Sequence, residues 1–220
     1  MIHHIPGVLD SESIGKVLAY MEQADLVEGT ETNANAKTKH NLQISQTDEG
    51  VAEISDLVCE ALMANAQLVQ SAFPKAMARP TFSRYEPGMK YGPHSDEPLI
   101  GSDPPIRGDV SCTVFLSDPD SYEGGELELW LGSLRAGVKY AAGDAVLYPT
   151  GAIHQVLPVT RGRRQVAVTW IQSYIADPQQ RAVLVQYYEM MAQVAPGADA
   201  PTRVLLESVR TNLFRMWSAV

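Results

Sequence analysis

The sequence predicts an α+β fold in which a sandwich or barrel of β-strands lies between two helical segments. The first third and the end of the chain carry apolar residues at helical spacing, whereas the middle consists of short runs of alternating apolar and polar residues. Gly, Pro and Asp separate these runs, as is typical of a sandwich or barrel, of which the jelly roll is one form. We therefore expect a helical region packed on the core at residues 1–78, the strand-rich core at 79–176 and a helical segment at 177–220.

Two helices are expected in the region 1–78. The first follows Asp10, which is a good N-cap residue, and its apolar stripe consists of Ile14, Val17, Leu18 and Met21. The second starts near Asp48 and ends at Phe73, and its apolar face consists of Val51, Ile54, Val58 and Leu62. Between the two helices, residues 28–41 are polar and rich in Thr, Asn and Lys, which predicts a loop.

The core region contains short runs that are expected to be strands. They cover residues 81–85, 110–116, 127–131, 145–148, 151–157 and 165–173. The pair Gly124-Gly125 is interpreted as a tight turn or bulge before a strand, because no helix start follows it as a phosphate loop would require.

The segment 177–220 is expected to form two helices. Asp177 is a cap followed by proline at the first helical position, a linker lies near residues 196–199, and the last helix runs through Trp217. These helices can pack on the core, form a homodimer, or both, and apolar stripes alone do not separate these alternatives.

The composition is that of a globular protein and excludes some classes of partner. The formal net charge is -9, and such an acidic surface repels phosphate backbones, so no nucleic-acid partner is expected. No run approaches the ~20 apolar residues of a membrane span, and no signal peptide is expected. Cys59 and Cys112 do not form a Cys-x-x-Cys motif and are interpreted as buried thiols. We therefore expect the protein to lie in a reducing cytoplasm.

Three residues of the core region form a candidate metal site. In His94-Ser95-Asp96 the first and third side chains point to the same face of a strand, and His154 follows on a separate predicted strand. A sheet folded on itself can bring His154 beside the other two. Two histidines and one carboxylate leave metal positions open, which is typical of non-haem Fe(II) oxygenases and also suits Zn.

Arg164 is a candidate for binding a carboxylate, because a fixed guanidinium forms two charge-assisted hydrogen bonds with such a group. With Asp96, Fe(II) carries a charge of +1, and Arg164 adds another. These charges balance the two carboxylates of 2-oxoglutarate, which would chelate iron at one end and meet Arg164 at the other.

Four segments resemble the PKHD-type hydroxylases, which are bacterial prolyl-4-hydroxylase-like dioxygenases. They are residues 82–96 (FSRYEPGMKYGPHSD), 107–129 (RGDVSCTVFLSDPDSYEGGELEL), 139–173 (KYAAGDAVLYPTGAIHQVLPVTRGRRQVAVTWIQS) and 212–217 (NLFRMW). The resemblance covers nearly the whole chain, and its two long segments are specific. It departs from the family after Asp96, where Glu97-Pro98-Leu99 replaces the usual Asn-Ala type continuation, so substrate contacts near this loop are expected to differ.

The resemblance implies a double-stranded β-helix core that uses Fe(II), 2-oxoglutarate and O2, with ascorbate as a reductant. It assigns His94, Asp96 and His154 as iron ligands and Arg164 as the arginine that binds 2-oxoglutarate. Tyr85 matches a tyrosine that helps bind 2-oxoglutarate, and core packing is the alternative role for it.

We expect a dioxygenase that couples oxidative decarboxylation of 2-oxoglutarate to hydroxylation of a small-molecule or peptidyl substrate. Asp96 argues against a halogenase, in which a small residue takes its place. Two alternatives stay open. A zinc hydrolase with the same ligands offers no use for Arg164 and lacks a general base placed by a motif, and Glu97 points away from Asp96 on an ideal strand. A non-catalytic sensor of iron or 2-oxoglutarate would bind without turnover.

Further residues of the core region have two interpretations each. Arg107 and Asp109 can orient a lid over the iron or form a surface salt bridge. Trp130 and Tyr140 can line a substrate pocket or belong to the core, where aromatic residues of strands usually lie.

Overall fold

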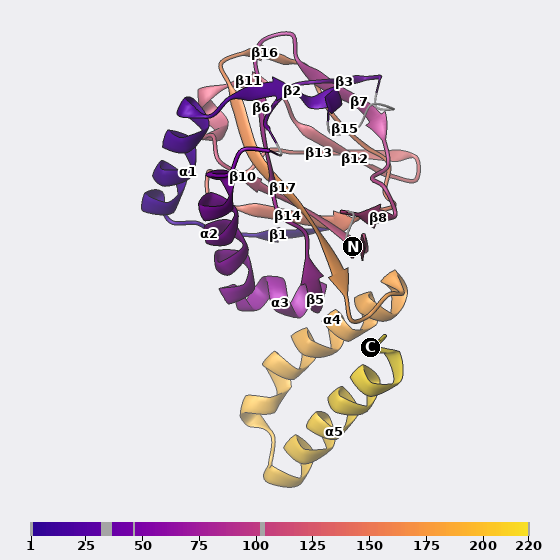
Figure 1. Ribbon diagram of the computed structural model, residues 1–220. Helices are drawn as coiled ribbons and strands as arrows, with labels where there is room; N and C mark the ends of the chain where they lie inside the picture. Colours follow the sequence, from indigo (N-terminus) through magenta and orange to yellow (C-terminus); the bar gives the residue numbers. More distant parts are fainter. Residues whose placement is uncertain (1, 32–36, 46, 102–103, 220) are drawn as a thin grey trace.

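Two antiparallel sheets form the centre of the computed structural model, which describes residues 2–31, 37–45, 47–101 and 104–219 (Figure 1). Within these residues the larger sheet has the order β1-β14-β10-β17-β6-β4-β2, with β5 also pairing with β17. Its strands are β1 (His3–Ile5), β2 (Leu26–Glu28), β4 (Leu42–Ile44), β5 (Pro74–Met77), β6 (Thr81–Tyr85), β10 (Val110–Phe115), β14 (Ala145–Pro149) and β17 (Arg164–Ser173).

The smaller sheet has the order β13-β12-β15-β7-β3. Its strands are β3 (Lys39–His40), β7 (Lys90–His94), β12 (Leu127–Leu131), β13 (Leu134–Val138) and β15 (His154–Val156). Two short pairs complete the described strands: β11 (Glu123–Gly124) with β16 (Val159–Arg161), and β8 (Leu99–Ile100) with β9 (Ile106–Arg107).

The larger sheet is buried on both faces, as the sequence of β10 illustrates. All six of its residues are buried, because successive side chains point to opposite faces and both faces are covered. Cys112 and Val114 belong to the outer core cluster, whereas Phe115 belongs to the cluster between the sheets. The inner cluster joins the two sheets through Tyr85, Phe115, Val166, Leu127, Leu129 and Val156.

Helices α1 (Ser11–Gln23), α2 (Val51–Ala64) and α3 (Ala66–Ala72) lie along one side of the larger sheet (Figure 1). Asp10 caps α1 as expected, since its side chain accepts a hydrogen bond from the Ser13 backbone at 2.8 Å. The outer cluster contains the predicted apolar residues Val17, Met21, Ile54, Val58 and Leu62 together with Val114, Leu147 and Ala167 of the sheet. The α+β class and the placement of N-terminal helices against the core are confirmed.

The helix expected from Asp48 to Phe73 is two helices, which corrects the sequence interpretation. Asn65 has an extended backbone, and its side chain accepts a hydrogen bond from the Leu68 N–H at 3.0 Å. This cap gives α3 a start of its own, because asparagine competes with the preceding helix for backbone hydrogen bonds. The apolar periodicity continues across the break and therefore does not reveal it.

The region 1–78 also contributes strands that the sequence interpretation missed. β1, β2, β4 and β5 join the larger sheet, and β3 adds an edge to the smaller one. The expected loop 28–41 thus includes the end of β2 and all of β3, while residues 32–36 lie outside the described residues. Strands of two to four residues are too short for a period-two pattern to be recognised. The division into three regions stays a prediction.

The C-terminal helices α4 (Pro178–Val194) and α5 (Ala200–Trp217) form an antiparallel hairpin that projects from the sheets (Figure 1). Its base is anchored by Arg181, whose buried guanidinium donates to the carbonyl of Ile175 at 2.6 Å. Ile175 also forms a bridge with Ser218, so the end of α5 returns to the base. Farther along α5, Val204 and Leu205 are exposed. None of the described helices combines the length and apolar character that a bilayer crossing requires.

Replacing Leu62 by alanine should destabilise the fold strongly, because this side chain of α2 is fully buried in the outer cluster. We expect the free energy of unfolding to fall by about 2–5 kcal/mol, the range for large-to-small changes in a core. Urea unfolding followed by circular dichroism measures it. The matched control is Met63→Ala on the same helix, since Met63 is 46% exposed. Equal losses in both variants would contradict the assigned face of α2.

Candidate active site

A cavity of about 270 Å³ is lined by residues of both sheets. The larger sheet contributes residues of β6, β10, β14 and β17, and the smaller sheet contributes residues of β3, β7, β12 and β15. Glu97, Leu99 and Ile100, which lie in β8 and the segment before it, also line it. The cavity contains His94, Asp96, His154, Arg164 and Tyr85, so all five predicted site residues meet in one place.

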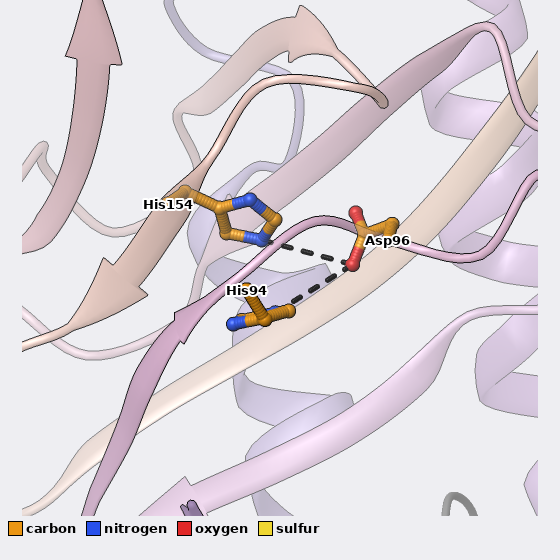
Figure 2. A group of neighbouring side chains, drawn as sticks. All are labelled: His94, Asp96 and His154. Carbon is orange, nitrogen blue, oxygen red and sulfur yellow. Dashed lines mark ion pairs between the residues drawn. The ribbon is translucent and has the colours of Figure 1, made fainter. Parts of the chain in front are cut away.

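His94, Asp96 and His154 direct their side chains at a common point (Figure 2). β7 pairs with β15 so that His94 lies opposite His154, and Asp96 follows β7 by two residues. The Nε2 atoms of both histidines lie 3.7 Å from the same Asp96 oxygen, Oδ1. One ligand atom from each residue falls within 4.8 Å of the others, so the group can hold a metal ion.

Both imidazoles are held with Nε2 available to a metal. The Nδ1 of His94 lies 2.8 Å from the carbonyl of Gly92, and the Nδ1 of His154 lies 3.0 Å from the carbonyl of Ala152. A carbonyl oxygen only accepts, so each Nδ1 carries the proton and each Nε2 keeps a lone pair. Burial, followed by the charge of His154, lowers the pKa of His94 to about 4, so its imidazole is neutral at neutral pH.

The Asp96 carboxylate is oriented by two donors from the larger sheet. Its Oδ2 accepts from the Ser111 hydroxyl at 2.6 Å and from the Trp170 indole N–H at 2.9 Å. Oδ1 therefore faces the two imidazoles. Ser111 and Trp170 are partners across β10 and β17. The sequence analysis missed both residues. Ser111 could have been found, because the alternation of the strand places this polar side chain on the inward face.

Arg164 is almost completely buried, at 1% exposure, and lines the same cavity. Its Nε has no hydrogen-bond partner, and no carboxylate of the described residues forms an ion pair with its guanidinium. The guanidinium carbon lies 5.0 Å from the ring centre of Tyr85 and 6.0 Å from that of Phe115. A buried cation without an anion is costly, so this arrangement fits an anionic ligand in the cavity.

Tyr85 lies beside Arg164, since the two residues are register partners of β6 and β17. Its ring packs in the inner cluster and also lines the cavity, so the structure is compatible with both roles considered for it. Burial raises the pKa of the Tyr85 phenol, whereas the charge of Arg164 lowers it. The hydroxyl stays protonated at neutral pH and can donate a hydrogen bond to a carboxylate.

The absence of a side chain at Gly125 leaves room for the side chain of Arg164. Its φ of +66° lies in the left-handed region, and a Cβ at this position would come within 3.1 Å of Cδ of Arg164 and 2.9 Å of Cγ2 of Val159. Gly124 and Gly125 both have a positive φ and come just before β12, which fits the predicted tight turn before a strand.

Arg107 and Asp109 form a bidentate ion pair at 2.7 and 2.9 Å and do not line the cavity. Asp109 also accepts from the backbone of Ser173 at 2.8 Å, which ties β9 to the end of β17. Trp130 and Tyr140 are not among the lining residues either. The ion pair of Arg107 and Asp109 therefore anchors the structure, and Trp130 and Tyr140 pack outside the cavity lining.

Replacing Trp170 by phenylalanine should weaken metal binding, because the ring stays while the hydrogen bond to Asp96 Oδ2 is lost. Loss of such a partner of a metal ligand typically costs about 10–100-fold in affinity. Competition between Co(II) and a chromophoric chelator measures it. Trp130→Phe is the matched control, since the indole nitrogen of Trp130 has no hydrogen-bond partner among the described residues. An unchanged affinity in Trp170→Phe would remove Trp170 from this role.

Solved structures share the fold of this chain. A prolyl-4-hydroxylase from Pseudomonas putida matches with a TM-score of 0.53 and 20% identity, covering 78% of this chain and 92% of that one. A prolyl hydroxylase of Trichoplax adhaerens, solved with a hypoxia inducible factor peptide fragment, matches at 0.53 and 16%, covering 83% and 86%. HygX from Streptomyces hygroscopicus, solved with nickel, 2-oxoglutarate and hygromycin B, matches at 0.55 and 16%, covering 78% and 82%. The jelly-roll core is thereby confirmed.

The sequence comparisons show the family. Residues 80–172 match the model of the 2OG-Fe(II) oxygenase superfamily. A PKHD-type hydroxylase of Pseudomonas putida (strain W619) is 38% identical over 226 residues, covering 100% of both chains. A PKHD-type hydroxylase of Maricaulis maris is 40% identical over 222 residues, covering 99% of both. The chain belongs to the PKHD-type hydroxylases and is an Fe(II)- and 2-oxoglutarate-dependent dioxygenase of the 2OG-Fe(II) oxygenase superfamily.

Proposed function

We propose that His94, Asp96 and His154 hold the Fe(II) and that Arg164 holds the carboxylate of 2-oxoglutarate that lies away from the metal. The observation that carries this assignment is the buried, unpaired Nε of Arg164 in the same cavity as the three candidate ligands. The donor set supports it as well, since two imidazoles and one carboxylate suit non-haem Fe(II).

When bound, Fe(II) with O2 supplies the oxidative decarboxylation of 2-oxoglutarate to succinate and CO2, coupled to hydroxylation of a C–H bond. The protein binds and orients the reactants. The charges of the site balance. Fe(II) carries +2 and Arg164 carries +1, while Asp96 carries -1 and 2-oxoglutarate carries -2. The hydroxyl of Tyr85, beside Arg164, donates a hydrogen bond to the carboxylate of 2-oxoglutarate. Leu127 and Val156 line the cavity and pack in one apolar cluster with Tyr85, so they keep water away from the part of the cavity near Tyr85.

Two rival assignments predict different behaviour. A zinc hydrolase with the same ligands could use Glu97, which lines the cavity, as a general base, but it would have no use for the buried Arg164. A sensor that binds 2-oxoglutarate without turnover would use the same residues. Succinate formation separates the sensor from the enzyme.

The substrate and setting are also proposals. We propose a small-molecule or peptidyl substrate, ascorbate as the reductant, and no nucleic-acid partner, the last supported by the net charge of -9. The structural neighbours solved with a peptide and with hygromycin B support both substrate classes. The free thiols Cys59 and Cys112 support a reducing cytoplasm. The exposed apolar residues of α5, Val204 and Leu205, support a homodimer through the C-terminal helices.

Asp96→Ala should abolish succinate formation, because it removes the only carboxylate among the candidate ligands that the structure describes. Purified protein with Fe(II), 2-oxoglutarate, ascorbate and O2 is assayed for succinate without added substrate. Asp120→Ala is the control, because it makes the same change at an exposed acid that does not line the cavity. We expect the wild type and Asp120→Ala to form succinate at similar rates. Full turnover by Asp96→Ala would refute the ligand assignment, and 2-oxoglutarate binding without succinate in the wild type would favour the sensor.

Arg164→Lys should raise the KM for 2-oxoglutarate by about tenfold or more. The lysine keeps the charge but loses the planar fork that binds a carboxylate through two hydrogen bonds. Steady-state succinate formation against 2-oxoglutarate concentration gives this constant. Arg163→Lys is the matched control, because the neighbouring Arg163 points to the surface, where it lies 3.4 Å from Glu22. A KM equal to that of the wild type would exclude Arg164 as the co-substrate clamp.

A further inference from the structure

Asn41 carries a buried amide that the pairing of the strands does not explain. The residue directly precedes β4, and its side chain is 0% exposed. Neither the oxygen nor the nitrogen of this amide forms a hydrogen bond with the described residues. Buried amides nearly always have such partners, because an unpaired donor or acceptor loses its bonds to water without a replacement. The unpaired amide therefore indicates a role outside the packing of the sheet.

Asn41 lies in a row of residues that ends at Arg164. β4 pairs with β6 so that Leu42 lies opposite Arg84, and continuing this register by one residue places Asn41 opposite Tyr85. Tyr85 is in turn the register partner of Arg164 on β17. Residues directly opposite each other lie on the same face of a sheet, with Cβ atoms about 4.5–5.5 Å apart. Since Tyr85 and Arg164 line the cavity, the amide lies on the cavity side of the larger sheet.

Gly29, on the other side of Asn41, leaves room for the amide. The backbone N–H of Gly29 donates to the carbonyl of Asn41 at 2.8 Å, so the two residues are neighbours at the ends of β2 and β4. A Cβ at position 29 would overlap Oδ1 of Asn41 and lie 2.9 Å from its Cγ. The amide oxygen is thus on the side of Gly29. The amide nitrogen, on the other branch, is left for the neighbour on β6, which is Tyr85.

The phenol of Tyr85 is sensitive to this amide. Burial is the largest influence on the pKa of Tyr85 and raises it, whereas the charge of Arg164 and then the amide of Asn41 lower it. A donor beside the phenol oxygen has this effect, because it stabilises negative charge on that oxygen. A phenol has a single O–H, so an oxygen that accepts from Asn41 must donate its own proton to another group.

We propose that Asn41 is a positioning residue for 2-oxoglutarate, whose Nδ2 donates to the phenol oxygen of Tyr85 and so directs the Tyr85 proton at the carboxylate held by Arg164. This inference rests on the proposed function, because it takes the carboxylate beside Arg164 from there. The carboxylate would complete the row, since the phenol would donate to it and accept from Asn41 at the same time. The amide would then have the partner that the sheet does not provide.

The test is a double-mutant cycle on 2-oxoglutarate binding, measured by calorimetry on the full-length protein loaded with Fe(II) without O2. Asn41→Leu keeps the branched shape of the side chain and removes its donor, and it is combined with Tyr85→Phe. Asn41→Ala is a second variant that needs less space, and circular dichroism verifies that each variant is folded. Ser55→Ala is the matched control. The Ser55 hydroxyl is also buried without a hydrogen-bond partner among the described residues, but it belongs to α2 and does not line the cavity.

We expect Asn41→Leu and Asn41→Ala to weaken 2-oxoglutarate binding by about three- to tenfold, as loss of one neutral hydrogen bond implies. Ser55→Ala should leave the affinity unchanged. In the Tyr85→Phe background, removing the amide should cause no further loss, because the amide acts through the phenol oxygen. Unchanged affinity in both Asn41 variants, or an equal loss with and without the Tyr85 hydroxyl, would overturn the inference. Unchanged 2-oxoglutarate binding in Arg164→Lys would instead overturn the proposed function on which it rests.

Discussion

The pairing of β7 with β15 is the constraint around which the site is arranged. It places His94 opposite His154, and the chain continuing from β7 brings Asp96 to the same point. Because side chains alternate across a strand, a slip of one residue in this register would turn one imidazole away from the cavity. The packed inner cluster, with Leu127 and Leu129 of β12 next to β15, makes such a slip unfavourable. The strand register that packs the core is therefore also the register that places the two histidines opposite each other.

The larger sheet contributes the polar groups that hold the Asp96 carboxylate and the cation of the cavity. Ser111 and Trp170 fix the Asp96 carboxylate from the opposite wall, and Arg164 supplies a buried cation. Each group lies where water is scarce, so its charge or hydrogen bond has a strong effect. The division between the sheets explains why neither alone could form the site: one presents the candidate metal ligands, and the other orients Asp96 and supplies Arg164, the proposed partner of the co-substrate.

The sequence reveals the residues whose chemistry depends on local spacing. His94 and Asp96 lie two residues apart on an extended segment, and Gly124-Gly125 marks a turn before a strand through its backbone freedom alone. Trp170 acts through a hydrogen bond to Asp96, which is distant in sequence, so no local pattern distinguishes it from other core side chains. The break at Asn65 was hidden for a related reason, since a cap interrupts the backbone while the apolar stripe continues. The roles of His94, Asp96, His154, Arg164 and Tyr85 stay predictions until the variants are measured.

The hairpin of α4 and α5 begins and ends at the same place. Arg181 and Ile175 hold the start of α4, and Ser218 at the end of α5 bridges to Ile175. A segment closed at its base in this way can gain or lose whole helical turns at its far end while the sheets stay where they are. Natural variation in chain length is therefore expected to concentrate around residues 195–199 at the tip, where additions and deletions would leave the catalytic geometry untouched.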